Sequence, residues 1–417
     1  MKHSYDELKM RQSLPLDVKV AMSCNRIREW INEYGESGVY ISFSGGKDST
    51  VLMDLVRNKC GYKNVKAMFV DVPMQYPELR EFVKKFDNVD IVKPKYNFIQ
   101  VCERYGFPII SKEVAEVVNG AKKYLTRLIE DGTISTDRQT DRQIPYHYYY
   151  DRITGRGKYA RNRNTFDGSP SDKVGEITDK IDIEELANVL NERMQQRKGG
   201  SNQRLAIMFG WLGRKKIQAN APEEDKSRYS QERYKYLLDA PFDISNKCCD
   251  IMKKNPAKEY EKPNGLKRMT AMMAAESRLR TQQWLLHGCN GFDMKNPSSN
   301  PMSFWTENDV LEYIYTNNIE ICSVYGKVVP ESNQLSFDDM GVSTGENKKY
   351  RTTGASRTGC MLCGFGCHLE KSPGRFELLN QTHPGMYGML DKITNNGVTF
   401  REAIEWINEH GGLNIKL

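Results

Sequence analysis

Apolar and polar positions in the first hundred residues switch between helical and strand-like spacing. Residues 16–35 carry apolar side chains three and four positions apart, which predicts a helix. The short apolar run Val39–Phe43 predicts a buried strand. Further strands are expected at 65–70 and 89–92, with helices over 51–56 and from Pro77. Strands that alternate with helices predict an α/β fold with a doubly wound parallel sheet.

The pattern changes in the second hundred residues. Residues 131–180 are polar and turn-rich and include the run Tyr146–Tyr150, while 182–216 has helical spacing and is basic. The window 191–220 holds seven lysines and arginines against one acidic residue. We interpret 121–235 as a basic, Tyr-rich helical insertion outside the sheet. Cations that bind phosphates and aromatic faces that stack on bases suit a nucleic-acid partner, and a solvated surface of mixed charge is the alternative.

The composition is that of an ordinary globular protein. Of the 417 residues 39% are hydrophobic and 28% charged, and the net charge is +7. No apolar run approaches the ~18 residues that a membrane span needs. The polar N-terminal stretch lacks the apolar core and the cleavage site of a secretory signal. We therefore expect a cytoplasmic protein without a membrane segment.

The residues after the first strand have the composition of a phosphate-binding loop. They are Ser44, Gly45, Gly46, Lys47, Asp48, Ser49 and Thr50. Glycines let the backbone approach a phosphate closely, and the following helix N-terminus offers free N–H groups. The hydroxyls add donors, Lys47 adds a positive charge, and Asp48 can hold Mg²⁺ or cap the helix. The spacing differs from that of the GxxxxGK[ST] loop.

Four of the ten cysteines fall into two pairs. Cys248 and Cys249 are adjacent, and Cys360 and Cys363 form a CxxC motif. Four thiolates can hold a [4Fe–4S] cluster or a tetrahedral Zn²⁺. Cys367 and the neighbouring His368 are substitute ligands, or else a buried thiol and a surface imidazole. The remaining cysteines are scattered along the chain, at Cys24, Cys60, Cys102, Cys289 and Cys322.

The SGGKDST string resembles the PP-loop of the ATP pyrophosphatase superfamily, and further segments resemble its PAPS reductase family. Val70–Glu78 resembles the family stretch DTGxxFPET, although the glycine of that stretch is replaced. This resemblance implies that Asp71 binds the nucleotide. Ala275–Arg280 resembles the arginine-rich motif that grips phosphate or sulfate, through Arg278 and Arg280. Pro301–Val310 resembles a helix start of the family, with Thr306 as the N-cap and Asp309 in the first turn.

The cysteine pairs resemble the cluster-binding pattern of assimilatory adenylylsulfate reductases, which favours a [4Fe–4S] cluster on Cys248, Cys249, Cys360 and Cys363 over zinc. Reductases of that kind attack sulfur with a cysteine near the C-terminus. No cysteine follows Cys367 in this sequence, and that departure counts against reduction by the usual route.

The resemblance implies an adenylylating ATP pyrophosphatase that acts in sulfur transfer. ATP and Mg²⁺ would bind at the loop, where Lys47, Asp48, Arg278 and Arg280 would act on phosphoryl charge. The implied partners are an adenine nucleotide, a sulfur donor such as a cysteine desulfurase and a nucleic-acid acceptor bound through 121–235. We also expect a homo-oligomer.

Two other functions stay open. A true reductase of adenylylsulfate, or of its 3′-phosphorylated form, would share the fold, the arginines and the cysteine pattern. A non-catalytic nucleotide-sensing or DNA-binding module would keep the loop for binding alone.

These interpretations divide the chain into four stretches. The PP-loop nucleotide-binding core is expected at 1–120, the insertion at 121–235, a completion of the core with the anion-binding arginines at 236–330, and the CxxC cluster region at 331–417. A closing helix is expected near 400–409.

Overall fold

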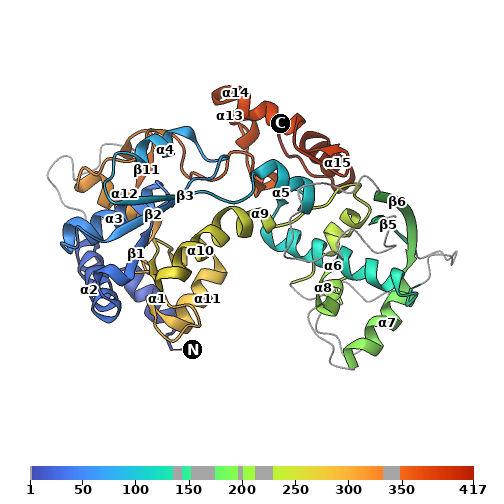
Figure 1. Ribbon diagram of the computed structural model, residues 1–417, viewed down its shortest axis with the longest axis horizontal. Helices are drawn as coiled ribbons and strands as arrows, with labels where there is room; N and C mark the ends of the chain where they lie inside the picture. The colour runs from blue at the N-terminus through green and yellow to red at the C-terminus, as the bar shows by residue number, and fades with distance from the viewer. Residues whose placement is uncertain (1, 135–142, 152–173, 196–200, 212–228, 332–347) are drawn as a thin grey trace. The chain divides into compact units, whose positions relative to one another are not determined.

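The chain forms two compact units, each assembled from two stretches of sequence. The computed structural model describes residues 2–134, 143–151, 174–195, 201–211, 229–331 and 348–417 (Figure 1). Unit 1 comprises Met1–Lys95 and Met252–Cys360, and unit 2 comprises Tyr96–Ile251 and Met361–Leu417. The functional division into four stretches stays a prediction.

A six-stranded, mostly parallel sheet forms the centre of unit 1. Its strands lie in the order β3-β2-β1-β7-β9-β8. They span β1 Val39–Ser42, β2 Lys66–Val70, β3 Val89–Val92, β7 Lys267–Met269, β8 Asn290–Gly291 and β9 Ser298–Ser299. Neighbouring strands from β3 to β9 are parallel, and β8 is antiparallel to β9. The predicted α/β class with a parallel sheet is confirmed. The strand order reverses at β1, where ligands of such sheets bind beyond the carboxyl ends of the strands.

Two of the helices expected in unit 1, at 16–35 and from Pro77, are confirmed, and the one expected at 51–56 has a different start. The helices of unit 1 are α1 Tyr5–Gln12, α2 Leu16–Tyr34, α3 Lys47–Asp54 with its continuation η2 Leu55–Lys59, α4 Pro77–Val83, α10 Asn255–Asn264, α11 Arg278–His287 and α12 Glu307–Thr316. The helix expected at 51–56 begins four residues earlier, because polar loop residues form its first turn and the N–H of Thr50 donates to the carbonyl of Gly46.

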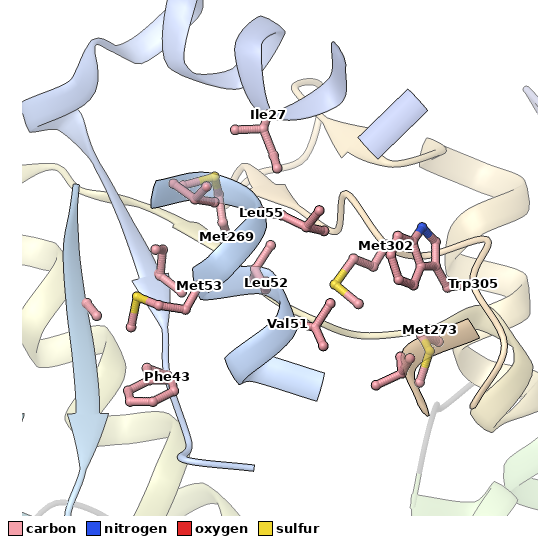
Figure 2. Packing of buried hydrophobic residues seen from close by; sticks show 14 of the residues in the cluster. Ile27, Phe43, Val51, Leu52, Met53, Leu55, Met269, Met273, Met302 and Trp305 are labelled. Carbon is pink, nitrogen blue, oxygen red and sulfur yellow. The ribbon is translucent and has the colours of Figure 1, made fainter. Parts of the chain in front are cut away.

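The apolar side of α3 fixes its position in the core of unit 1 (Figure 2). Val51 and Leu52 are fully buried in the same cluster as Phe43. Figure 2 also shows Met302 and Trp305 near α3. The first turn of α3 is therefore held by a packed helix, so the loop before it starts from a rigid base.

A buried ion pair joins α2 to the start of α12. Lys19 Nζ lies 2.8 Å from each carboxylate oxygen of Asp309, and only 2% of the lysine side chain is exposed. Asp309 also accepts from the backbone N–H of Thr306 at 2.6 Å, while the Thr306 hydroxyl accepts from the N–H of Asp309. The predicted cap at Thr306, with Asp309 in the first turn, is confirmed.

Removing one partner of this pair is expected to leave an uncompensated buried charge. Asp309→Ala should lower the free energy of unfolding by about 3–5 kcal/mol, measured by urea denaturation. Asp293→Asn, which disrupts an exposed pair with Lys2, is the control and should leave the transition unchanged. Equal stability of Asp309→Ala and the parent protein would contradict this role.

Unit 2 is mainly helical. Its helices are α5 Phe98–Tyr105, α6 Lys112–Glu130, α7 Ile183–Gln195, α8 Ser201–Met208, η4 Glu232–Leu238, α9 Lys247–Cys249, α13 Arg375–Thr382, α14 Pro384–Tyr387 and α15 Phe400–Gly411. Its strands form three pairs: β4 Ile109–Ile110 with β12 Gly364–Phe365, β5 Gln143–Asp151 with β6 Val174–Asp182, and β13 Thr394–Asn395 with β14 Val398–Thr399. The closing helix expected near 400–409 is confirmed as α15.

The basic insertion is only partly described. Strands β5 and β6 pair with each other and not with the central sheet, and α8 packs on α6 and α7. Helix α6 continues across residue 120, where the insertion was expected to begin. Within the insertion, residues 135–142, 152–173, 196–200 and 212–228 lie outside the described part of the chain. Among the described residues, no helix has both the length and the apolarity to cross a membrane.

Candidate functional site

The phosphate-type loop lies at the carboxyl end of β1 and needs both of its glycines. Gly45 has a φ of +73°, and a Cβ there would lie 3.0 Å from a methyl carbon of Val83. A Cβ on Gly46 would lie 3.1 Å from the hydroxyl of Tyr325 and 3.2 Å from that of Ser44. Only glycine lets the chain turn here and keeps its backbone open to a ligand.

Hydroxyls within the loop hold its shape. The Ser49 hydroxyl donates to the carbonyl of Gly46 at 2.9 Å, and the Thr50 hydroxyl donates to the same carbonyl at 3.1 Å. The backbone N–H of Ser44 donates to Ser49 Oγ at 3.2 Å. Ser49 and Thr50 are buried, so their hydroxyls stabilise the loop from the protein side.

Lys47 is a buried cation between two carboxylates. Its side chain is 3% exposed, and Nζ lies 3.2 Å from Glu307 Oε1 and 3.5 Å from Asp48 Oδ1. Asp48 Oδ1 is itself buried, and no hydrogen-bond partner for it lies among the described residues. Glu307 is the first residue of α12, so the buried Lys19–Asp309 pair also positions this carboxylate. The loop and the start of α12 together thus offer one cation and two carboxylates to a ligand.

The two predicted arginines have different surroundings. Arg280 forms an ion pair with Glu276. Its pKa is lowered, first by burial and then by the positive charge of Arg357, while the negative charge of Asp48 acts in the opposite direction. Arg278 is exposed at the first position of α11. Of the two arginines, Arg280 is the one that the structure brings to Asp48 of the loop.

This difference predicts unequal effects of two matched substitutions. Arg280→Gln should weaken binding of an anionic nucleotide about tenfold or more, because a charge-assisted hydrogen bond is lost. Arg278→Gln should change affinity less than twofold, since that guanidinium is exposed at the helix start. Titration calorimetry on both variants measures the difference, and equal losses would refute the assignment.

Asp71 follows β2 and is held by an arginine of the next helix. Its Oδ1 lies 2.5 Å from Nε of Arg80, and its side chain is 17% exposed. Its backbone N–H donates to the carbonyl of Val92. The carboxylate is therefore positioned at the carboxyl edge of the sheet, and its predicted contact with the nucleotide stays a prediction.

Several residues beside the loop were not identified from the sequence. Tyr325, 2% exposed, accepts a hydrogen bond from the backbone N–H of Lys47 at 3.3 Å. Its hydroxyl lies 2.6 Å from Thr358 Oγ1. Glu307 and Arg357 complete this set, which comes from segments distant in sequence. The one available signal was that Arg357-Thr358 stands one residue before the CxxC motif, separated from it by Gly359.

Unit 2 holds five of the cysteines, and Cys248 interacts with three of them. Together with these three it forms what is here called the thiol cluster: Cys102, Cys248, Cys249 and Cys363. The pKa of Cys248 is raised, most strongly by a hydrogen bond with Cys249, then by burial and by the charges of Cys363 and Cys102. Burial, and then Cys363, raises the pKa of Cys102. Cys102 lies on α5, which packs against α9. A cysteine that looked scattered in the sequence is thus a neighbour of the predicted ligands.

The thiol cluster does not yet have the arrangement of a metal site. Among the described residues, no three His, Cys, Asp or Glu side chains are placed so that they could hold a metal ion. Cys360 is the last residue of unit 1, whereas Cys363 belongs to unit 2. The donor chemistry of the cysteines suits iron or zinc, but their geometry does not establish a cofactor.

The alternative ligands Cys367 and His368 have surroundings that differ from those of the thiol cluster: the Cys367 thiol is buried and hydrogen-bonded, and His368 is partly buried. Burial raises the pKa of Cys367 to about 12, and its thiol donates to the carbonyl of Gly364 at 2.7 Å. Burial also lowers the pKa of His368, with a further contribution from Arg233. Arg375 donates to the carbonyl of Cys363 and to that of Phe365, and so fixes the turn after the CxxC motif.

One family model matches the chain over more than half of its length. The family model described as "Phosphoadenosine phosphosulfate reductase domain" matches residues 38–108 and 213–364, more than half of the 417. Among solved structures, the chain is similar to the phosphate complex of phosphoadenylyl-sulfate (PAPS) reductase from Candida auris. The identity is 12% and the TM-score 0.30, over 82% of this chain and 95% of that chain. No curated protein matches the chain.

Proposed function

Because this chain belongs to the phosphoadenosine phosphosulfate reductase family, we propose that it binds an adenine nucleotide at Ser44–Thr50 and cleaves ATP between the α- and β-phosphates. The observation that carries the choice of ATP is the pair of carboxylates, Asp48 and Glu307, on either side of buried Lys47. Carboxylates repel a bare sulfate or phosphate but suit a triphosphate that arrives with Mg²⁺, which is typically held by one or two carboxylates and by phosphate oxygens.

The residues of the chain would act mainly by neutralising charge. An oxygen of the acceptor attacks the α-phosphorus, its bond to phosphorus forms as the bond to the bridging oxygen breaks, and pyrophosphate leaves. Lys47, the N–H groups at the start of α3 and Arg280 would face the phosphoryl oxygens on which negative charge grows. Mg²⁺ bound at Asp48 and Glu307 would supply further positive charge.

The cysteines would serve the sulfur-transfer half of the reaction. A sulfur nucleophile displaces AMP from the adenylylated acceptor, so that a carbon–sulfur or phosphorus–sulfur bond replaces the bond to oxygen. A [4Fe–4S] cluster would be held by Cys248, Cys249, Cys360 and Cys363, with zinc as the alternative. A sulfur donor such as a cysteine desulfurase and a reducing, cytoplasmic environment fit this role.

The acceptor is proposed to be a nucleic acid bound through residues 121–235. The family model leaves residues 109–212 unmatched. This fits an element that binds the acceptor of this particular protein and takes no part in the chemistry common to the family. The seven cations against one acid in 191–220 fit a phosphate backbone. Binding to RNA and DNA at several salt concentrations tests this step, and affinity that does not change with salt would refute it.

The products of ATP distinguish this proposal from its alternatives. Protein purified without oxygen, incubated with ATP, Mg²⁺, cellular RNA and sulfide as the sulfur nucleophile, should yield AMP and pyrophosphate in equal amounts. The second candidate is favoured by the description of the family itself: a reductase should release sulfite from adenylylsulfate, or from its 3′-phosphorylated form, with thioredoxin as the reductant. Sulfite release without AMP formation from ATP would replace the proposal by the reductase.

A further inference from the structure

Two segments far apart in the sequence are joined beside the phosphate loop of unit 1. The first is η7 Ser323–Tyr325 with the turn after it, and the second is residues 353–358. Strands β10 Val328–Pro330 and β11 Tyr350–Thr352 pair antiparallel and bring the segments together. Backbone N–H groups of 353, 354 and 355 then donate to the carbonyls of 327, 325 and 324, each at 2.9 Å. The second segment is therefore held in place before it reaches the loop.

The second segment places a hydroxyl pair at the start of α3. Tyr325 and Thr358 are joined by their 2.6 Å hydrogen bond, and the tyrosine oxygen accepts from the N–H of Lys47. A Cβ on Gly46 would lie 3.1 Å from the Tyr325 hydroxyl and 3.5 Å from that of Thr358. Both hydroxyls thus line the space at the N-terminus of α3, where backbone N–H groups favour the binding of a phosphoryl group.

Arg357, the residue before Thr358, adds a second guanidinium to this segment. Its charge acts on Arg280, which also interacts with Asp48. Two cations of like sign raise each other's energy, and an anion between them removes that cost. Arg357 is exposed, and its neighbour Thr358 is fixed at the loop, so the guanidinium can reach a group that extends beyond the loop.

We propose that Tyr325, Thr358 and Arg357 bind the substrate. The two hydroxyls contact the phosphoryl group in the loop, and Arg357 with Arg280 binds a second anionic group of the same nucleotide. The substrate class is therefore a nucleotide with two separated anionic groups. This inference rests on the proposed nucleotide site, but not on whether the nucleotide is ATP or a sulfonucleotide.

The arrangement has a consequence for the cysteines. Thr358 lies two residues before Cys360, so a ligand that engages the Thr358 hydroxyl fixes the chain at the start of the CxxC motif. Nucleotide binding would then slow modification of Cys360 by a thiol reagent in the full-length protein.

The test compares three nucleotides by titration calorimetry on full-length protein. Arg357→Gln should weaken ATP with Mg²⁺ and adenylylsulfate about tenfold, and AMP, with one anionic group, less than threefold. Thr358→Val should weaken all three about fivefold, because each uses the hydroxyl in the loop. Arg351→Gln, an exposed arginine on β11, is the matched control and should bind like the parent protein.

The same experiment contains the results that would overturn the inference. These are unchanged affinities in Arg357→Gln, an equal loss in Arg351→Gln, or tighter binding in Thr358→Val, which would make the hydroxyl pair a competitor of the ligand. Tyr325→Phe is expected to have the same effect as Thr358→Val. If this substitution in the core unfolds the protein, Arg357→Gln and Thr358→Val still test the inference. Binding of adenylylsulfate without turnover of ATP would refute the proposed function and leave this inference standing. Failure of all three nucleotides to bind would refute both.

Discussion

Lys47→Ala is expected to lower kcat/KM for ATP cleavage by about a hundredfold to a thousandfold, the cost of removing one preorganised charge at a phosphoryl group. The substitution removes the only cation that the described residues place within 4 Å of Asp48 and Glu307. The two carboxylates would then be compensated only by the Mg²⁺ that arrives with the triphosphate, so binding should weaken together with the chemical step.

Release of pyrophosphate and AMP, measured without oxygen, tests this expectation. Lys84→Ala is a suitable control, because Lys84 lies on the surface of unit 1 and pairs only with exposed Glu81 among the described residues. It should cleave ATP at the parent rate. If Lys47→Ala kept more than a tenth of the parent activity, the result would contradict a role of this lysine in ATP cleavage.

Cys363→Ser is expected to abolish iron binding. A [4Fe–4S] cluster needs four ligands, and Cys363 is the thiol whose charge acts on Cys102, Cys248 and Cys367 in unit 2. Protein reconstituted with iron and sulfide should contain about four irons per chain, and the variant close to none. Iron and zinc analysis with the visible absorption spectrum gives the answer independently of activity.

Cys60→Ser serves as the control for this experiment, since Cys60 is a half-buried thiol of unit 1 at the end of η2. It should bind as much iron as the parent. Full iron content in Cys363→Ser would exclude this cysteine as a ligand, and zinc without iron in the parent would favour the tetrahedral zinc site.

The elements near the N-terminus could be predicted because their signals are local. The helix at 16–35 and the strands at 39–43, 65–70 and 89–92 each have a complete periodic pattern within a few residues. The start of α3 could not, since its first turn consists of Lys47–Thr50, polar residues that carry no apolar periodicity. Their place in the helix follows from packing of the next turn in the core.

The position of the loop Ser44–Thr50 after the first strand could be predicted because the loop is contiguous in sequence, and its binding of phosphate stays a prediction. The residues that surround the loop could not be predicted. Tyr325, Thr358 and Glu307 reach the loop only through the tertiary structure, and no residue spacing reports such contacts. Cys102 next to Cys248 is a case of the same kind.

The arginine motif illustrates a limit of motif resemblance. Arg278 and Arg280 stand two positions apart on one helix, and residues at that spacing do not share a face. Only one of them can therefore turn toward the loop, and it is Arg280 whose charge interacts with Asp48. A linear motif names both arginines, but helix geometry selects between them.

Nucleotide preference of the protein purified without oxygen tests the central claim most directly. Melting temperatures would be compared with ATP, adenylylsulfate and the 3′-phosphorylated form, each with and without Mg²⁺, because a ligand of the native state raises the melting temperature with its saturation. We predict the largest shift with ATP and Mg²⁺, and its loss in Lys47→Ala and Glu307→Ala. A larger shift with either sulfonucleotide, independent of Mg²⁺, would contradict the ATP pyrophosphatase account and favour a reductase.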